Sequence, residues 1–442
     1  MTGPKILVCT VGGSDAPVVT AVRAGTWDHV LFVCTDDSVT MVTGQVTVPE
    51  RNAAPATTRP SIPGQASLDA AKWSTLTVPA DDPDAVYARL IERLDVLRRR
   101  FPGVQMTVDF TGGTKSMSAG AVLAVASRAG MALQVTTGDR SDLVKVVDGT
   151  QAAVALGTER IVIERQIELL RETWKNFGYQ EAADGFEKLH TDFFRLEKSN
   201  PLARRLHFWT NLGKAFAAWD RFDRVQAVEN IKLPTREGGP EINNLAILAN
   251  KLKLTMNPNP PTSLVLFDLL RNAERCAHRG RYDDAVARYY RLWEWTVQWL
   301  LKAKNNIETG DVDTKKIHVP SNFSFGPTPK GNGRYEIGSA KAWELYRILN
   351  PDSEATKFWN NSSPENKTNA TLYKDYGQLR NRSILGHGER PVSKDDWTKI
   401  HAWTAGPFMD MVRTVAKSLD QPGDMPQLPT DLPEPLLPST LP

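Results

Sequence analysis

The chain has 442 residues, about three times the roughly 150 residues of a common domain, so two or three domains are expected. Hydrophobic residues make up 41% and charged residues 24%, an ordinary globular composition that excludes a wholly disordered chain. The net charge of +3 is too small to predict a nucleic-acid-binding protein, so any such function must be argued from local sites.

The cysteines and the apolar runs bear on where the protein works. Cys9, Cys34 and Cys276 are too few and too widely spaced for a disulfide framework or a Cys-x-x-Cys metal pair, which fits a reducing compartment. The N-terminal stretch has no signal-peptide layout, and no run of 18 apolar residues occurs. We therefore expect a soluble, cytoplasmic protein.

Residues 1–158 alternate between predicted strands and helices. Strands are predicted over residues 5–10, 29–35, 104–110, 132–137 and 143–148, and helices over residues 16–24, 82–100 and 116–131. Continuous apolar runs such as KILVCT and HVLFVCT are typical of a parallel sheet covered on both faces. The pattern predicts a Rossmann-like α/β domain with a parallel sheet, and the proline-rich residues 44–67 predict a long surface excursion.

From residue 159 onwards the strand signal largely stops. Helices are predicted over residues 160–188, 191–197, 202–223, 241–254, 263–279, 282–303, 339–349, 369–386 and 394–419. The breaker cluster TMNPNPP at residues 255–261 predicts a boundary between a helical linker domain, residues 159–255, and an all-α domain, residues 256–419. The polar residues 305–334 predict a loop, and the proline-rich residues 420–442 predict a disordered tail.

Two glycine-rich loops follow predicted strands of the first domain. Each leads into a helix, so each offers backbone N–H groups and the positive end of a helix dipole to an anion. Lys115 adds a mobile cation, and the hydroxyls of Thr10, Ser14 and Thr114 add hydrogen-bonding groups. We predict a phosphate-rich ligand bound by Thr10, Gly12, Gly13, Ser14, Thr111, Gly112, Gly113, Thr114 and Lys115.

The same loops have a simpler interpretation as ordinary strand–helix turns in which glycine relieves strain. Neither the G-x-x-x-x-G-K-[ST] spacing of a P-loop nor the G-x-G-x-x-G fingerprint of a dinucleotide site is present. Asp36 and Asp109, at strand ends, could contact a ligand or simply cap turns.

Residues 109–120, DFTGGTKSMSAG, resemble the signature of CARF domains, the CRISPR-associated Rossmann-fold sensors. The resemblance covers roughly residues 1–155. It implies a homodimer whose paired N-terminal domains bind a cyclic oligoadenylate across the two-fold axis.

Near the end of the helical region, Arg380 and His387 are separated by about two helical turns. If the helix persists that far, both side chains and Asn381 lie on one face, whereas Arg382 is turned away. A histidine of near-neutral pKa can move protons to or from the 2′-hydroxyl and 5′-oxygen of RNA, and a guanidinium can stabilise the charge on the phosphate. These residue types suit RNA cleavage without a metal or other cofactor, although the two cations could also merely stabilise a helix C-terminus.

The run RNRSILGH, starting at Arg380, resembles the R-x(4–6)-H signature of HEPN ribonucleases. A CARF-like head and a HEPN-like tail on one chain resemble the ancillary ribonucleases of type III CRISPR systems, the Csm/Csx group. This resemblance implies an allosterically activated endoribonuclease of antiviral defence, with catalytic Arg380, Asn381 and His387 from both chains, single-stranded RNA as substrate and products ending in a 2′,3′-cyclic phosphate. Two alternatives stay open: a sensor with an inactive helical binding domain, and a sensor that itself cleaves its cyclic ligand at the second glycine loop.

Three further groups of residues have less specific patterns. Arg271, Arg275 and Arg279 form an i, i+4 stripe that either follows an RNA backbone or is a solvated helix face. Trp293, Trp295 and Trp299 favour core or dimer contacts over base stacking. Glu294 either orients Arg380 from a neighbouring helix or is a surface carboxylate. The remaining histidines show no metal-ligand spacing, so no catalytic metal is predicted.

Overall fold

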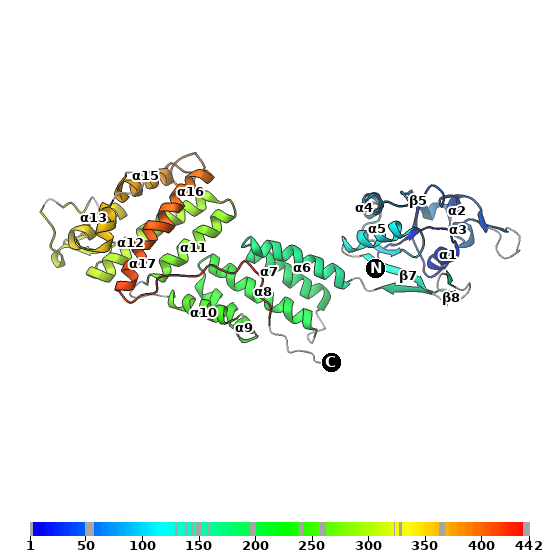
Figure 1. The fold of residues 1–442 in the computed structure, drawn as a ribbon, viewed down its shortest axis with the longest axis horizontal. Coiled ribbons are helices and arrows are strands. Elements are labelled where there is room, and N and C mark those ends of the chain that lie inside the picture. The colour runs from blue at the N-terminus through cyan, green and yellow to red at the C-terminus, as the bar shows by residue number, and fades with distance from the viewer. Residues whose placement is uncertain are drawn as a thin grey trace. The chain divides into compact units, whose positions relative to one another are not determined.

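The structure is a computed structural model that forms two compact units, Met1–Ile167 and Glu168–Pro442 (Figure 1). It describes residues 3–48, 57–128, 131–137, 140–142, 145–146, 152–156, 159–194, 200–237, 242–256, 262–321, 323–326, 329–361 and 367–435.

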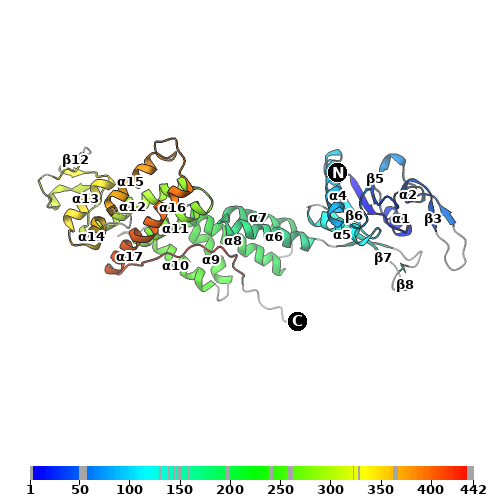
Figure 2. The same ribbon diagram turned by 45° about the horizontal axis from the view of Figure 1, so that its top comes forward.

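The N-terminal unit is built on a six-stranded sheet with the strand order β10-β7-β6-β1-β2-β5. Figure 2 labels β5, β6 and β7 of this sheet. Five strands are parallel, and the edge strand β10 runs antiparallel to β7. The predicted Rossmann-like fold is confirmed, with a mixed sheet in place of a wholly parallel one. The strands are β1 (Lys5–Thr10), β2 (His29–Cys34), β5 (Trp73–Thr77), β6 (Gln105–Asp109), β7 (Met131–Thr137) and β10 (Ala152–Leu156).

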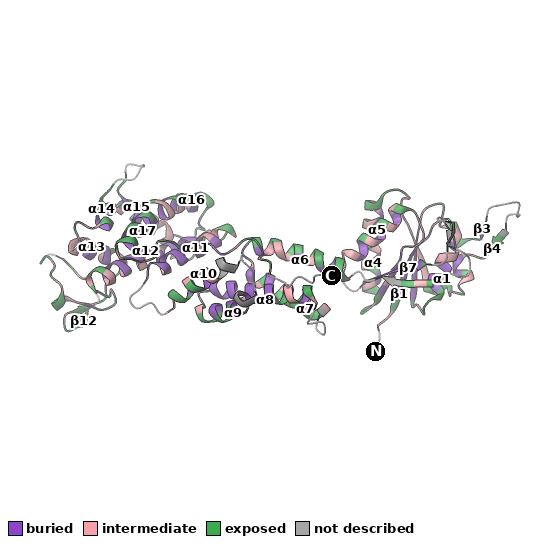
Figure 3. Ribbon diagram, turned by 60° about the horizontal axis from the view of Figure 1, so that its bottom comes forward, coloured by how far each residue is buried: buried purple, intermediate pink, exposed green. Residues whose placement is uncertain are grey.

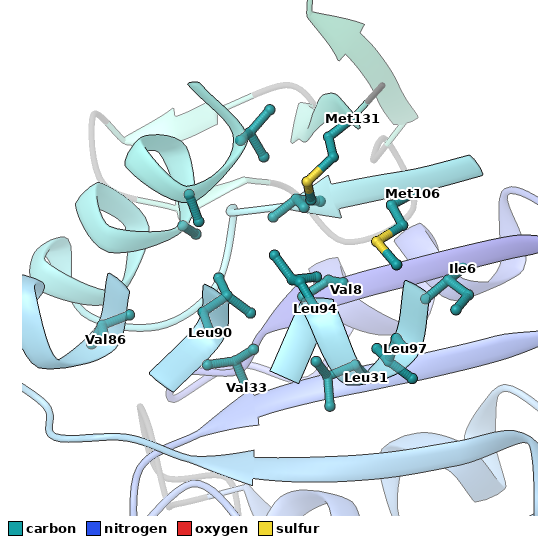
Figure 4. Close-up of a cluster of buried hydrophobic side chains, with 14 of the residues drawn as sticks. Ile6, Val8, Leu31, Val33, Val86, Leu90, Leu94, Leu97, Met106 and Met131 are labelled. Atoms are coloured by element: carbon teal, nitrogen blue, oxygen red, sulfur yellow. The ribbon is translucent and has the colours of Figure 1, made fainter. Parts of the chain in front are cut away.

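The two faces of this sheet bury alternate residues of the same strands, as the two-residue period of a strand requires. Ile6 and Val8 of β1 pack under α4 (Pro83–Arg100) and α5 (Lys115–Ala126), as Figure 4 shows. Leu7 and Cys9 pack on the other face, against α1 (Ala16–Arg23). Burial on both faces explains why the central strands are continuous apolar runs.

The close packing of α4 and α5 depends on small residues in α5. A Cβ on Gly120 would lie 2.7 Å from Cγ1 of Val86 in α4, so a larger residue would force the helices apart. The apolar face of α4 is formed by Val86, Leu90, Leu94 and Leu97, each no more than 2% exposed. Replacing one of these leucines by alanine would cost about 2–5 kcal/mol.

The remaining elements of this unit are short. They are α2 (Thr40–Thr43), β3 (Val46–Val48), β4 (Thr57–Arg59), α3 (Ile62–Gln65), η1 (Ala70–Lys72), β8 (Arg140–Asp142) and β9 (Lys145–Val146). The surface excursion predicted over residues 44–67 contains an antiparallel β3–β4 hairpin, and its residues 49–56 lie outside the described residues. The strand predicted over residues 143–148 is described only at residues 145–146, which pair with β8 in a separate hairpin.

The second unit is helical, as predicted. Its helices, with α6 starting in the first unit, are α6 (Glu159–Lys175), α7 (Tyr179–Phe194), α8 (Pro201–Asp220), α9 (Arg224–Glu237), α10 (Ile242–Leu254), α11 (Leu264–His278), α12 (Tyr282–Asn305), α13 (Ser339–Leu349), α14 (Glu354–Asn360), α15 (Asn369–Asn381), α16 (Lys394–Trp403), the π-helical turn η3 (Thr404–Phe408) and α17 (Met409–Ser418). The single helix expected over residues 160–188 is divided at Phe177, whose φ of 58° no helix continues through.

Large aromatic side chains are among the most deeply buried of the helical unit, whose buried residues are purple on the ribbon of Figure 3. Trp293 and Trp299 of α12 are 0% and 2% exposed, so their predicted core role is confirmed. Trp295 is half-buried, and the guanidinium of Arg291 lies 5.1 Å from its ring centroid.

The loop predicted over residues 305–334 contains regular structure. Short strands β11 (Val312–Asp313), β12 (Pro329–Gly331) and β13 (Arg334–Tyr335) form an antiparallel sheet in the order β11-β13-β12, and η2 (Thr314–Lys316) follows β11. Strands of two or three residues leave no apolar period from which a sequence pattern could predict them.

Residues 421–435, named here the C-terminal strap, lie in extended form against the helices of the same unit. The carbonyl of Pro429 accepts hydrogen bonds from the Trp174 indole (3.1 Å) and the Tyr179 hydroxyl (3.0 Å), and the carbonyl of Pro433 accepts from Trp209 (2.7 Å). Met425, Leu428 and Leu432 of the strap are buried. The expectation of a disordered tail is therefore wrong for residues 421–435, because its apolar residues between prolines are buried; residues 436–442 lie outside the described residues.

The arginine stripe of α11 binds this strap and its surroundings. Nε of Arg271 donates to the carbonyl of Met425 (2.8 Å), and Nε of Arg279 donates to that of Asn176 (3.1 Å). Arg275 is only 1% exposed, with Nε 2.7 Å from the Asp220 carboxylate. The stripe is neither an RNA track nor a solvated face, and both interpretations of it are wrong.

Candidate functional site

The two glycine loops meet at the carboxyl edge of the sheet, because the strands they follow, β1 and β6, are neighbours. A Cβ on Gly12 would lie 2.5 Å from the backbone nitrogen of Gly113, and one on Gly112 would overlap the Thr10 carbonyl. Gly113 has a φ of +86°, which a residue with a side chain adopts only with strain. The glycines therefore allow backbone to pack against backbone.

The three threonines of these loops use their hydroxyls inside the protein. The Thr10 hydroxyl donates to the Gly112 carbonyl (2.5 Å), and that of Thr111 accepts from the Thr136 backbone N–H (2.6 Å). The Thr114 hydroxyl donates to the Ala80 carbonyl and accepts from the Met117 N–H as the N-cap of α5. The Thr10 and Thr114 hydroxyls, predicted to bind a ligand, are engaged here in holding the loops together.

Asp109, at the end of β6, fixes the second glycine loop through its side chain. Its side chain accepts hydrogen bonds from the Thr111 N–H (3.0 Å), the Gln134 amide (3.1 Å) and the Thr136 hydroxyl (3.2 Å). The residue is 1% exposed. Asp109 thus fills the turn-capping role that the sequence had left open.

The remaining predicted ligand residues are accessible. Gly13, Ser14 and Lys115 are exposed, and nothing lies within 4 Å of the position of a Gly13 Cβ. A cavity of about 260 Å³ lies between the loops, lined by Val11, Gly12, Gly13, Thr35, Asp37, Ser38, Met41, Gly113, Thr114 and Met117. The N-terminus of α5 opens next to it, so backbone N–H groups and the helix dipole favour an anion there.

In the third segment of this cavity, residues 35–41, sequence reasoning named only Asp36 and missed the lining residues Thr35, Asp37, Ser38 and Met41. The hydroxyls of Thr35 and Ser38 bind one another and each other's backbone N–H groups, which closes the turn after β2. This turn lies at the same sheet edge as the glycine loops, because β2 pairs with β1. Only the strand order places this turn beside the glycine loops, and the sequence alone does not reveal that order.

The second candidate site lies at the C-terminal end of α15. The helix ends at Asn381, so the expectation that it continues to residue 386 is wrong. The chain instead folds back: the His387 N–H donates to the Asn381 carbonyl (2.8 Å), and the Gly388 N–H donates to that of Ser383 (3.1 Å). His387 therefore reaches the end of the helix by a tight loop and not by helical periodicity.

Two glycines make this loop possible. A Cβ on Gly386 would overlap the Arg380 carbonyl, and a Cβ on Gly388 would overlap the backbone of Arg382. Ser383 is buried and reinforces the turn, since its hydroxyl donates to the Arg380 carbonyl (2.7 Å). Gly386 and Gly388 thus allow the chain to return His387 to the helix end.

Arg380 is half-buried and held in place, whereas His387 and Asn381 are exposed. The Arg380 guanidinium lies 4.8 Å from the ring centroid of Tyr290 in α12, and its Nη1 donates to Oδ1 of Asn381 (3.2 Å). Burial raises the pKa of Tyr290, and Glu294 adds to that rise while Arg380 opposes it. The contact with the Tyr290 ring holds the Arg380 guanidinium in a fixed position, where it loses part of its hydration.

Glu294 lies near this cluster without binding Arg380 directly in the part of the chain that the structure describes. Its carboxylate pairs with Arg291, one turn earlier on α12, at 3.1 Å. Of the two roles considered for Glu294, a paired carboxylate at the half-buried edge of α12 is the one observed.

Among the described residues, no three His, Cys, Asp or Glu side chains gather as a metal site would require. No helix within the described ranges is long and apolar enough to cross a membrane.

The comparisons with known proteins agree with this architecture. Residues 256–406, which include α15 and its loop, match the family model described as the Csm6 HEPN domain. The fold matches Csm6 of Enterococcus italicus bound to cyclic hexa-2′-fluoro-hexa-dAMP, with a TM-score of 0.54 over 94% of this chain and 95% of that chain, at 12% identity. The chain has the fold of Csm6. The resemblance to CARF–HEPN ancillary ribonucleases is thereby confirmed.

Two other solved structures match over smaller parts of the chain. Can2 of Sulfobacillus thermosulfidooxidans in complex with cyclic tetra-adenylate matches with a TM-score of 0.24 and 13% identity, over 50% of this chain and 68% of that chain. Protein VC1899 of Vibrio cholerae matches with a TM-score of 0.25 and 10% identity, over 61% and 68%. No curated protein matches the sequence.

Proposed function

We propose that this protein is a cyclic-oligoadenylate-activated endoribonuclease of type III CRISPR antiviral defence that works as a homodimer. Residues 1–158 are the sensor, residues 159–255 the linker and residues 256–419 the ribonuclease domain. The match of residues 256–406 to the Csm6 HEPN domain and the Csm6 fold support this division.

The proposed ligand site is the cavity between the glycine loops. Its 260 Å³ suits about one nucleotide unit, so a cyclic oligoadenylate would extend across two copies of the chain. We expect Ser14 and Lys115, both exposed in these loops, to bind phosphate, and Gly13 to let a phosphate or ribose approach the backbone. Csm6 of E. italicus, which shares the fold, was solved with such a cyclic ligand.

One observation carries the proposed catalysis: the backbone hydrogen bond from the His387 N–H to the Asn381 carbonyl brings His387 to the helix end that carries Arg380. In the proposed reaction the 2′-oxygen attacks the phosphorus, the bond to the 5′-oxygen breaks, and a 2′,3′-cyclic phosphate forms. His387 moves the protons, while Arg380 and Asn381 stabilise the charge on the phosphate. The proposed reaction requires no metal or cofactor.

A dimer supplies the acid and the base that one histidine cannot provide together. Ile384 and Leu385, in the same loop as His387, are 56% and 48% exposed, which favours a contact with a second copy at this loop. To raise the active fraction from about 1% to about 99%, the ligand must favour the active arrangement by roughly 5.5 kcal/mol.

The test compares cleavage of single-stranded RNA by the wild type and His387→Ala, with and without cyclic oligoadenylates of three to six units, in EDTA. We expect ligand-dependent cleavage by the wild type, and a loss of at least about 10²-fold in the variant, because general acid–base catalysis contributes that much. The protein without ligand should cleave slowly.

His318→Ala is the matched control, since it removes a histidine of the same unit outside the site. Both variants should bind the cyclic ligand as the wild type does, which thermal shift measures. Cleavage that survives in His387→Ala would overturn the catalytic assignment, and ligand binding without any cleavage by the wild type would favour a sensor with an inactive helical domain.

A further inference from the structure

A second cavity adjoins the loop that carries His387. It has a volume of about 340 Å³ and lies between α15 and the start of α16. Its lining residues are Asp375, Gln378, Leu379, Arg382, Ser383, Arg390, Pro391, Val392 and Asp396. None of the residues proposed for catalysis lines it, so its chemistry needs a separate explanation.

Two carboxylates and two guanidinium groups line this cavity, and only the carboxylates have partners within the described chain. Asp375 pairs with Lys367 (2.7 Å), and Asp396 accepts from the hydroxyl and backbone N–H of Ser393 in the capping box of α16. The side chains of Arg382 and Arg390, both exposed, form no hydrogen bond or ion pair with any residue that the structure describes. Two guanidinium groups therefore remain with their donors unoccupied.

Five other arginines of the helical unit pair with carboxylates at 3.2 Å or less, namely Arg281, Arg288, Arg291, Arg334 and Arg413. Arg382 and Arg390, in contrast, have no such partner among the described residues.

The backbone holds both arginines at the end of α15. Arg382 is the C-cap of the helix, and a parallel bridge pairs Ser383 with Arg390 at the base of the loop. The Val392 N–H donates to Asp283 of α12 (3.0 Å), which fixes the chain after Arg390. The loop thus closes on itself at the end of α15, with His387 returned to Asn381 and Arg390 held beside Ser383.

We propose that Arg382 and Arg390 form a subsite for backbone phosphates of single-stranded RNA, beside the cleaved bond. A guanidinium matches the geometry of phosphate oxygens with two parallel hydrogen bonds, and the Gln378 amide adds a neutral donor. This subsite deepens the proposed function and rests on it: it binds the substrate chain next to Arg380 and His387 without touching the reacting atoms.

The experiment measures binding separately from cleavage. The full-length Arg382→Gln/Arg390→Gln variant binds a fully 2′-O-methylated RNA, whose blocked 2′-hydroxyls prevent cleavage, at several salt concentrations between 50 and 200 mM. We expect about tenfold weaker binding, and a slope of log K against log salt that falls by about 1.4, since each phosphate contact on a single strand contributes about 0.7. Cleavage of long RNA should show a raised KM, while kcat for a dinucleotide, which has no flanking phosphate, stays unchanged.

Lys374→Gln/Lys399→Gln is the matched control, because it removes two exposed positive charges from α15 and α16 outside the cavity. It should leave the salt slope within about 0.3 of the wild type. Arg382→Lys/Arg390→Lys keeps the charge and should recover the slope, which guards against a loss of folding. An unchanged slope in the glutamine variant, with a lower Tm alone, would overturn the proposal and leave the arginines a purely structural role; loss of cleavage in His387→Ala tests the catalytic site independently of this result.

Discussion

Glycines close both the loops of the N-terminal unit and the His387 loop of the helical unit, but the polar side chains have opposite roles in the two. In the N-terminal unit, glycines let two backbone segments touch, and the hydroxyls nearest that contact form the hydrogen bonds that hold it together. In the helical unit, glycines let one segment fold back on a helix end, and the side chains that the fold exposes, His387 and Asn381, stay accessible. The comparison teaches that a polar residue in a glycine loop is available for chemistry only when the backbone, and not its side chain, closes the loop.

The strongest way to break this comparison is Gly388→Ala. The added methyl group would overlap the backbone of Arg382 and push the loop off the end of α15. We expect RNA cleavage to fall by about 10²-fold, because displacements of about 1 Å cost that much in an oriented site. Steady-state cleavage with saturating cyclic ligand measures the effect.

Gly377→Ala is the control for this prediction, since nothing lies within 4 Å of its added Cβ and the residue is inside α15. It should keep full activity and gain about 0.5–1 kcal/mol of stability. If Gly388→Ala cleaves at the wild-type rate, the tight loop is not what positions His387.

In the N-terminal unit, Gly12→Ala and Gly13→Ala separate a packing glycine from a ligand glycine. A methyl group on Gly12 would lie 2.5 Å from the Gly113 nitrogen, so we expect a loss of about 1–3 kcal/mol in the free energy of unfolding. A methyl group on Gly13 meets open space, so Tm should hold while affinity for the cyclic ligand falls several-fold. Thermal unfolding without ligand and thermal shift with ligand distinguish the two, and equal Tm losses would refute the distinction.

The smallest effect is expected from the hydroxyls. Thr10→Val keeps the shape but removes the donor to the Gly112 carbonyl, which should cost about 1 kcal/mol of stability. Ser14→Ala, at an exposed position of the same loop, should leave stability unchanged and weaken ligand binding. Urea unfolding of the full chain gives the first value, and a stable Thr10→Val variant with weakened binding would mean that its hydroxyl reaches the ligand.

Much of the fold was predictable from the sequence because its elements carry strong periods. The apolar runs of β1 and β2 and the stripe from Val86 to Leu97 on α4 indicate directly which residues are buried. The short strands β11 to β13, the antiparallel edge strand β10 and the helix α9 were not predictable, since they lack such a period or contain breakers such as Pro234.

For the candidate sites, the residues were easier to predict than their geometry. The R-x(4–6)-H spacing pointed to Arg380 and His387, although the helical reasoning for their proximity was wrong, because Gly386 and Gly388 close a turn where a helix had been assumed. Thr35 and Ser38 could not be associated with the glycine loops before the strand order was known. Arg275 looked like a surface residue because one of its partners, Gln427, lies 152 positions away in a segment that composition alone marks as unstructured.

The C-terminal strap also has a consequence for how the protein is made. The hydrogen bond between Trp174 and Pro429 spans 255 positions, so α6 can form this contact only after the C-terminal strap has been synthesised. A nascent chain stalled before Pro429 should therefore leave the indole N–H of Trp174 open to hydrogen exchange, and the helical unit would become fully ordered only once the strap is in place.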